Sequence, residues 1–367
     1  MKPMMRFFRG LFGVGLLLHG LVHAMGFVAY WPLAEVAELP YKTALWGGRL
    51  VLGAGGMRLF AVVWLAAALA FAVGTVLLAL RRRAWAGVIL TAALVSLVLC
   101  ILDWEAAFRG AWINAAVLLV LGVVFGLRRS PAPLPPVPLT AGTVDTVPLP
   151  AGLPQPVERY LRGVYGERLP LIHSAVLTGR GTLRVMGVTF PARIRFSHRS
   201  GYDYRHYLEA TFWGRPVMKV NEVYRDGRGR LELPFGVEEG PAVDSAANQG
   251  LWAEMMYYPA SLVTDPRVRW ESVDERRAKL HVPFGEETQT FTFEFDPASG
   301  DFVRLETLRL RDSKTPPMRW WCESPVVDGR KVFTATWEDE GTPWLTEWLE
   351  DAVYNADVSA YLRQKGA

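Results

Sequence analysis

Two patterns of apolar and polar residues divide the chain. The first consists of long apolar runs without Asp, Glu, Lys or Arg, which occupy residues 10–34, 59–80, 84–102 and 110–127. A helix needs about 20 apolar residues to cross the hydrocarbon core of a bilayer. The runs therefore predict an α-helical membrane bundle of four spans within residues 1–129.

The second pattern has a period of two and starts near His173. Phe291, Phe293 and Phe295 alternate with polar residues, so their rings share one face of a strand. An Asp-Gly pair at 226–227, between two such runs, is typical of a hairpin turn. About eleven strand-like runs with short connections follow one another, which predicts a curved antiparallel β-sheet or half-barrel.

Apolar residues at helical spacing interrupt this second pattern. They predict short helices over Leu153–Tyr165 and Trp344–Asp351, and one long helix over Asp244–Val263 that is inserted between strands. The predicted fold class is therefore a four-span membrane bundle followed by an α+β domain with one inserted helix.

A proline-rich segment, Ser130–Pro156, separates the two patterns. Proline fixes φ and lacks an N–H donor, so this segment fits neither a helix interior nor a central strand. We expect a semi-extended linker. The predicted organisation is a transmembrane domain over residues 1–129, a linker over 130–156 and a soluble β-rich domain over 157–367.

Charge is distributed unevenly between these parts. Residues 1–130 carry a net charge of +8 and residues 131–367 carry −4. The basic residues flank the apolar runs and do not form a basic face on a folded domain, so we expect no nucleic-acid partner. Because Lys and Arg concentrate on the cytoplasmic side, their distribution predicts a multi-pass inner (plasma) membrane protein whose N-terminus and β-rich domain face the cytoplasm.

Five polar residues form a candidate intramembrane cluster: His19, His23, Asp103, Glu105 and Asn114. His19 and His23 are four residues apart and share a helix face. Ionisable groups inside a membrane are often functional, so one interpretation is a metal, haem or proton-transfer site. The other is hydrogen bonding between helices, with Asp103 and Glu105 solvated in a loop.

The remaining sequence contains no motif that specifies a reaction. GxxxxGK[ST], GxSxG, HExxH and CxxC are all absent, and the two cysteines do not form a disulfide framework. His173, His198, His206 and His281 lack an obvious nucleophile partner, and we interpret them as surface or core residues. We therefore expect a non-enzymatic protein without a cofactor.

Large aromatic residues and methionines mark a candidate ligand pocket in the β-rich domain. The candidates are Trp252, Met255, Met256, Trp270, Phe293 and Trp337. Such residues can line an adaptable apolar pocket, and they can equally fill an ordinary core. Membrane lipids and an apolar small ligand are the expected partners, and the oligomeric state is left open.

Several short motifs make the chain similar to a bacterial family known as a domain of unknown function. They are HGLVHAMG at 19–26, the run around Trp64, DWEAAF at 103–108, Asn114, LPQPVERYL at 153–161, MYYPA at 256–260, FEFD at 293–296 and TPW at 342–344. The resemblance implies a β-rich part like the curved sheet of lipoprotein carriers, with an apolar concave face able to hold acyl chains.

Three functions are compatible with the sequence. The first is a membrane-anchored module whose β-rich domain binds a lipid or another apolar ligand. The second is an intramembrane metal, haem or proton-coupled activity at His19 and His23. The third is a structural or regulatory interaction protein that has no small ligand.

Overall fold

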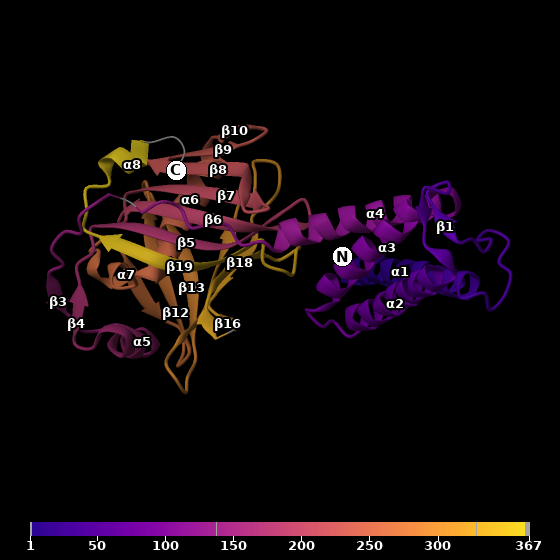
Figure 1. The fold of residues 1–367 in the computed structure, drawn as a ribbon. Coiled ribbons are helices and arrows are strands. Elements are labelled where there is room, and N and C mark those ends of the chain that lie inside the picture. The colour runs from indigo at the N-terminus through magenta and orange to yellow at the C-terminus, as the bar shows by residue number, and fades with distance from the viewer. Residues whose placement is uncertain (1, 137, 328, 364–367) are drawn as a thin grey trace. The chain divides into compact units, whose positions relative to one another are not determined.

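The computed structural model describes residues 2–136, 138–327 and 329–363. The chain divides into two compact units, Met1–Phe125 and Gly126–Ala367. The first unit is helical and the second is built on a large β-sheet (Figure 1). Val137 of the predicted linker and residues 364–367 of the predicted β-rich domain lie outside the described residues.

Four long helices form most of the first unit in the part of the chain that the structure describes, together with a short pair of strands, β1 (Ala44–Leu45) and β2 (Leu50–Val51). The helices are α1 (Lys2–Tyr30), α2 (Gly53–Ala79), α3 (Trp85–Leu102) and α4 (Trp104–Arg128). Each is long and apolar enough to cross a membrane, which confirms the four helices expected from the apolar runs. Large apolar side chains such as Leu59 and Leu119 are 68% and 71% exposed, so the bundle presents an apolar outer surface.

Glycine lets α1 and α2 approach closely. A Cβ atom at Gly26 would lie 2.4 Å from the ring of Trp64, and one at Gly20 would lie 2.7 Å from Cβ of Phe71. Small residues serve the same purpose in many membrane helix pairs, where contact between backbones depends on the absence of a side chain. Both glycines are therefore required by the packing of the bundle.

A single antiparallel sheet dominates the second unit. In spatial order its strands are β10 (Gly236–Glu239), β9 (Arg228–Leu233), β8 (Arg215–Arg225), β7 (Asp203–Phe212), β6 (Val188–Arg199), β5 (Ser174–Val185), β19 (Leu345–Tyr354), β18 (Phe333–Trp337), β15 (Met318–Glu323), β14 (Phe302–Arg309), β13 (Glu287–Phe295), β12 (Arg277–Phe284) and β11 (Arg269–Ser272). The sheet thus contains two meanders, and the last strand of the chain lies between them. This arrangement confirms the curved antiparallel sheet predicted from the alternating pattern.

The last strand, β19, corrects one sequence-based expectation. The helix predicted over Trp344–Asp351 is wrong, because these residues are extended and pair with β5 on one side and β18 on the other. The spacing of apolar residues in this segment resembles that of a helix. The segment is extended because it pairs with β5, whose residues are distant in sequence. A Cβ atom at Gly181 of β5 would lie 1.9 Å from the carbonyl oxygen of Thr346, so glycine is needed there for the close approach of β19.

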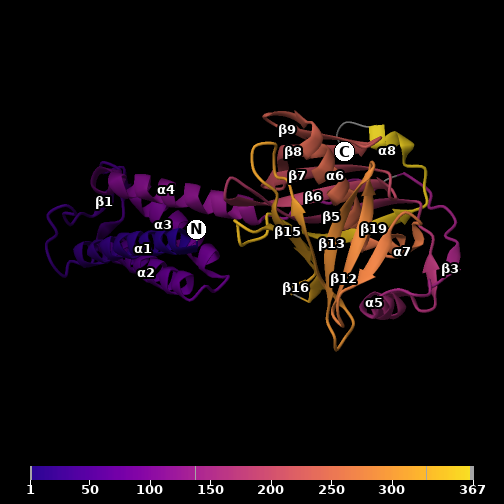
Figure 2. The ribbon, with the colours of Figure 1, turned by 180° about the vertical axis from the view of Figure 1, so that it is seen from behind.

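One helix lies across both meanders. α6 (Pro241–Glu254) packs against β8 and β9 of one meander and against β12 and β14 of the other, as can be followed from behind in Figure 2. The helix predicted over Asp244–Val263 starts earlier, at Pro241, and is broken into α6, a 3₁₀ turn (Met255–Tyr257) and α7 (Ser261–Thr264). The predicted helix near residue 153 is observed as α5 (Gln155–Tyr165).

Part of the proline-rich segment is packed against the β domain. Leu134 is only 3% exposed. Arg193 on β6 donates to the carbonyl of Ala132 (3.3 Å), and Arg180 on β5 donates to that of Pro131 (3.1 Å). Further along, β3 (Thr146–Pro148) pairs with β4 (Arg168–Pro170). The segment therefore contributes contacts to the second unit.

A pair of fragments tests this contribution. We expect the fragment from Ser130 to the C-terminus to fold with a higher melting temperature than the fragment from Ala151. The shorter one loses the burial of Leu134, worth about 2 kcal/mol, together with β3. In a domain of this size that corresponds to a difference of roughly 4–8 °C, measurable by circular dichroism. Equal melting temperatures would show that the segment adds no stability.

Candidate functional site

A cavity of about 550 Å³ lies between α6 and the sheet. Strands of both meanders contribute apolar side chains to its wall. These include Leu183, Phe196, Leu208, Met218, Val220, Leu231, Leu233, Trp320, Phe333, Trp337 and Leu345. The volume falls within the range of about 300–1,000 Å³ that is typical of small-molecule sites.

Small residues on one face of α6 leave this space open. Ala242, Ala246, Gly250 and Ala253 all line the cavity, and their spacing places them on one side of the helix. The opposite face carries Leu251, which is fully buried in the core. One face of the helix therefore contributes large side chains to the core, and the other borders the cavity.

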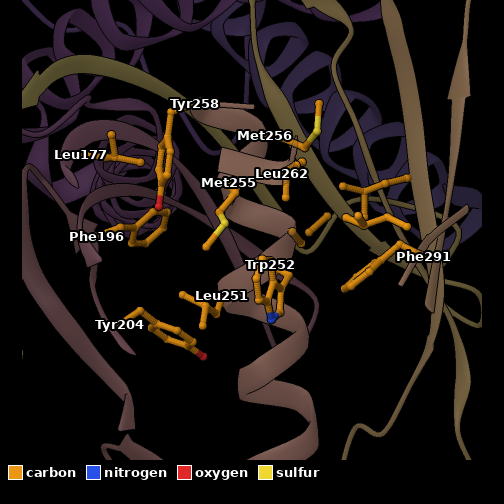
Figure 3. Close-up of a cluster of buried hydrophobic side chains, with 14 of the residues drawn as sticks. Leu177, Phe196, Tyr204, Leu251, Trp252, Met255, Met256, Tyr258, Leu262 and Phe291 are labelled. Atoms are coloured by element: carbon orange, nitrogen blue, oxygen red, sulfur yellow. The ribbon is translucent and has the colours of Figure 1, made fainter. Parts of the chain in front are cut away.

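The six residues predicted as a pocket do not lie together at this cavity. Trp337 lines it, whereas Trp252, Met255, Met256 and Phe293 belong to the buried core and Trp270 packs against that core. Figure 3 shows Trp252, Met255 and Met256 within a dense cluster that includes Phe291 and Leu262. Apolar periodicity identifies a buried helix face, but it does not distinguish a filled core from an open cavity.

Charged residues form a buried polar group in the same cavity wall. His206 (β7) lies opposite Glu222 (β8) in the strand register, and Nδ1 of His206 is 3.5 Å from Oε2 of Glu222. Glu254 is the last residue of α6, and its Oε2 lies 3.0 Å from Nε2 of His198 on β6. Nε2 of His206 contacts the same oxygen without the alignment of a hydrogen bond. Finally, Nδ1 of His198 is hydrogen-bonded to the hydroxyl of Tyr258 (2.6 Å).

Burial and charge act in opposite directions on this group. Burial disfavours the charged form of His206, but the carboxylates of Glu254 and Glu222 outweigh it and raise the pKa of His206 to about 9. Burial lowers the pKa of His198, against the effect of Glu254. Burial by itself would raise the pKa of Glu254, but the two histidines outweigh burial and hold the pKa of that carboxyl below its usual range.

A second carboxyl in the wall behaves differently. Glu347 on β19 accepts a hydrogen bond from the hydroxyl of Tyr257 and is 5% exposed. Burial, followed by the nearby Glu254 carboxylate, raises the pKa of Glu347 to about 8, against the opposing effects of Tyr257 and His206. The cavity therefore contains a carboxyl that holds its proton near neutral pH.

Sequence reasoning treated His198 and His206 as unrelated surface or core residues. In the structure they lie on neighbouring strands with ring centroids 5.7 Å apart, and both are buried. A signal was present: both histidines occupy the inward positions of their strands, together with Phe196 and Leu208. Glu254, by contrast, reaches them only through the packing of α6 against the sheet.

The predicted intramembrane cluster separates into two parts. Nε2 of His19 is 3.0 Å from Oδ1 of Asn114, and Nε2 of His23 is hydrogen-bonded to the hydroxyl of Ser96. Asp103 is buried elsewhere, where it pairs with Lys42 and accepts a hydrogen bond from Tyr30. Glu105 is exposed. The hydrogen bonds of both histidines to neighbouring helices favour the interpretation of hydrogen bonding between helices. The solvated position expected for Asp103 is wrong, because its carboxylate is buried against Lys42 and Tyr30.

The fold and the cavity define a class of protein: a four-helix apolar unit joined to a curved antiparallel sheet with a mainly apolar cavity. The chain belongs to DUF6544, a family of unknown function whose profile matches residues 143–346. This confirms the resemblance to a family without assigned function. No protein with curated annotation is significantly similar to the chain.

Several solved structures are similar to the β domain. One is a domain named for outer membrane lipoprotein sorting from Vibrio parahaemolyticus, with 12% identity over 52% of this chain and 92% of that chain and a TM-score of 0.30. Another is a DUF1329 family protein from Desulfovibrio piger, with 12% identity over 57% of this chain and 96% of that chain and a TM-score of 0.32. A third is a LolA superfamily protein from Nitrosomonas europaea, with 10% identity over 57% of this chain and 96% of that chain and a TM-score of 0.33.

The core position of Met255 can be tested against an exposed methionine. Met255 is fully buried, and we expect Met255→Ala to lower the free energy of unfolding by about 2–5 kcal/mol because it leaves a void. Met186 is 94% exposed, and Met186→Ala should change the free energy of unfolding by less than about 0.5 kcal/mol. Denaturant unfolding followed by tryptophan fluorescence measures both. Equal stabilities would contradict the placement of Met255 in the core.

The raised pKa of Glu347 predicts a dependence of stability on pH. An unfolded chain loses this proton near the usual value of 4.5, and the folded protein loses it at about 8. Between these values the folded state holds the extra proton, so the free energy of unfolding falls as pH rises, by up to about 1.4 kcal/mol per pH unit.

The variant Glu347→Gln removes this titration. We expect the melting temperature of Glu347→Gln, measured relative to that of the wild type, to be higher at pH 8 than at pH 6. The control Glu275→Gln changes an exposed residue and should follow the wild-type curve. Differential scanning fluorimetry across this range provides the comparison. A constant offset between Glu347→Gln and wild type would be inconsistent with a shifted pKa.

Proposed function

We propose that this protein is anchored in the membrane by α1–α4 and that its β domain binds a small, largely apolar ligand in the cavity beneath α6. The apolar wall and the volume of about 550 Å³ are the observations that carry this proposal. Pockets of this kind combine a mostly apolar lining with a few polar groups that orient the ligand.

The polar residues of the wall restrict the chemistry of the ligand. His206, Glu222, Glu254 and Glu347 line the cavity beside the apolar side chains, and Arg309 contributes a cation. The histidine and these carboxyl groups pair with one another or with Tyr257, and a carboxylate or protonated carboxyl in the wall retains hydrogen-bonding capacity that a polar group of a ligand can use. An amphiphile with an acyl chain and a polar group, such as a lipid, matches both parts of the wall.

The four apolar helices support membrane anchoring. Each is long enough to span a bilayer, and large apolar side chains cover the outside of the bundle. An anchor of this kind keeps the β domain at the membrane surface, where lipids are abundant. The membrane is therefore the natural source of the ligand.

The orientation follows from the basic residues between and beside the spans. Arg81, Arg82 and Arg83 separate α2 from α3, and Arg128 and Arg129 follow α4. Lys and Arg in short loops are retained in the cytoplasm, which supports a cytoplasmic position for the β domain.

Reporter fusions test the orientation. We expect a fluorescent reporter attached after Ala367 to be active and an alkaline phosphatase attached there to be inactive, because the latter needs an oxidising compartment. Fusions after Arg49, between α1 and α2, should show the reverse. Phosphatase activity at the C-terminus would place the β domain outside the cytoplasm.

A photoreactive fatty acid tests ligand binding in the full chain. After irradiation, we expect labelled peptides from α6, β15 and β18. Ala246→Phe places a ring in the cavity and should lower this labelling roughly tenfold. Val217→Phe adds the same ring at an exposed position of β8 and should leave labelling unchanged.

Labelling of α1–α4 by the same probe serves as an internal reference, because the membrane helices are unaffected by either substitution. If label is confined to those helices in the wild-type protein, or if Ala246→Phe leaves the labelling of β15 and β18 intact, the cavity is not the binding site.

A further inference from the structure

We propose that His198, His206 and Glu254 bind one divalent transition-metal ion of the zinc type in the cavity wall. Each residue offers one ligand atom, and these atoms lie within 4.8 Å of one another. The residues come from β6, β7 and the C-terminal end of α6, so the sheet and the helix must pack together to form the site. The proposal stands independently of the apolar ligand.

The donor set and its spacing match this ion. Two imidazole nitrogens with one carboxylate oxygen are ligands that Zn²⁺ accepts, with bonds of about 2.0–2.2 Å. Tetrahedral ligands at that distance lie about 3.3 Å apart. Nε2 of His198 and Oε2 of Glu254 are 3.0 Å apart, so small side-chain shifts suffice to place an ion between them.

The neighbours of the two histidines also fit. Metal-binding histidines commonly use their second ring nitrogen in a hydrogen bond that fixes the ring. Nδ1 of His198 bonds to the hydroxyl of Tyr258, and Nδ1 of His206 faces the carboxylate of Glu222. Both Nε2 atoms are thereby directed toward Oε2 of Glu254.

One carboxylate oxygen serves both histidines of the polar group. Nε2 of His206 is buried and lies against Oε2 of Glu254, the same oxygen that faces Nε2 of His198. An ion held by the two nitrogens and this oxygen would satisfy all three atoms at once. His206 and Glu254 line the cavity, so an ion held by them would border it, within reach of a water molecule or a ligand oxygen.

Titration of the full chain with metal tests the proposal. The detergent-purified protein is stripped with a chelator and titrated with Zn²⁺ alone, and we expect one equivalent to bind. His206→Gln and Glu254→Gln should abolish binding at this site. His281→Gln is the matched control, because His281 forms a comparable pair with Glu271 (2.9 Å) outside the cavity. Failure of the wild type to bind zinc, or equal binding by all variants, overturns the proposal.

The residues that contact Nδ1 of the two histidines, Tyr258 and Glu222, provide a second test. Tyr258→Phe and Glu222→Gln retain all three ligands, and we expect them to weaken zinc binding roughly 10–100-fold. Unchanged affinity in both would contradict the role of these residues in orienting the histidines, and with it the site as described.

A measurement on the wild-type protein covers the case in which the ligand variants misfold. Bound Cu²⁺ with ascorbate oxidises the histidines that hold it, and peptide mapping then locates them. Oxidation of His198 and His206 supports the site, whereas oxidation restricted to His19, His23, His173 or His281 overturns it. Fatty-acid labelling is measured separately, so loss of metal binding is distinguishable from loss of ligand binding in the cavity.

Discussion

The pairing of β19 with β5 is the interaction on which the β domain depends. Without it, the sheet would end in unpaired edges at β5 and β19, and exposed edges of this kind invite association with other chains. The cavity is lined by residues of both meanders, and α6 packs against both. Joining the meanders through β19 therefore creates the surface that α6 covers and the cavity that it leaves.

One face of α6 packs into the core and the other borders the cavity. Leu251 and Trp252 fill the core on one face of α6, and Met255 of the adjoining 3₁₀ turn continues that core. Close-packed cores tolerate little change in volume. Ala242, Ala246 and Gly250 on the other face leave the cavity open. A larger side chain at any of these three positions would fill the space, so small size is the property on which the cavity depends.

Buried charge in this cavity is stabilised by mutual pairing. An isolated carboxylate inside a protein costs several kcal/mol, and Glu254 avoids this by lying between His198 and His206. Glu347 has no cationic partner in hydrogen-bond distance among the described residues and instead holds its proton. The wall thus combines an ionised carboxylate with a protonated one, which gives it both acceptor and donor character toward whatever occupies the cavity.

The sequence by itself determined the four apolar helices, the antiparallel sheet and the core face of α6, because each depends on the spacing of residues that are close in the chain. It did not determine the strand character of 345–354, the cavity or the meeting of His198 with Glu254, which are 56 residues apart. Pairing with β5 overrides the local helical pattern of β19. Whether an apolar helix face is filled or open depends on the elements opposite it, and only the tertiary structure places those elements.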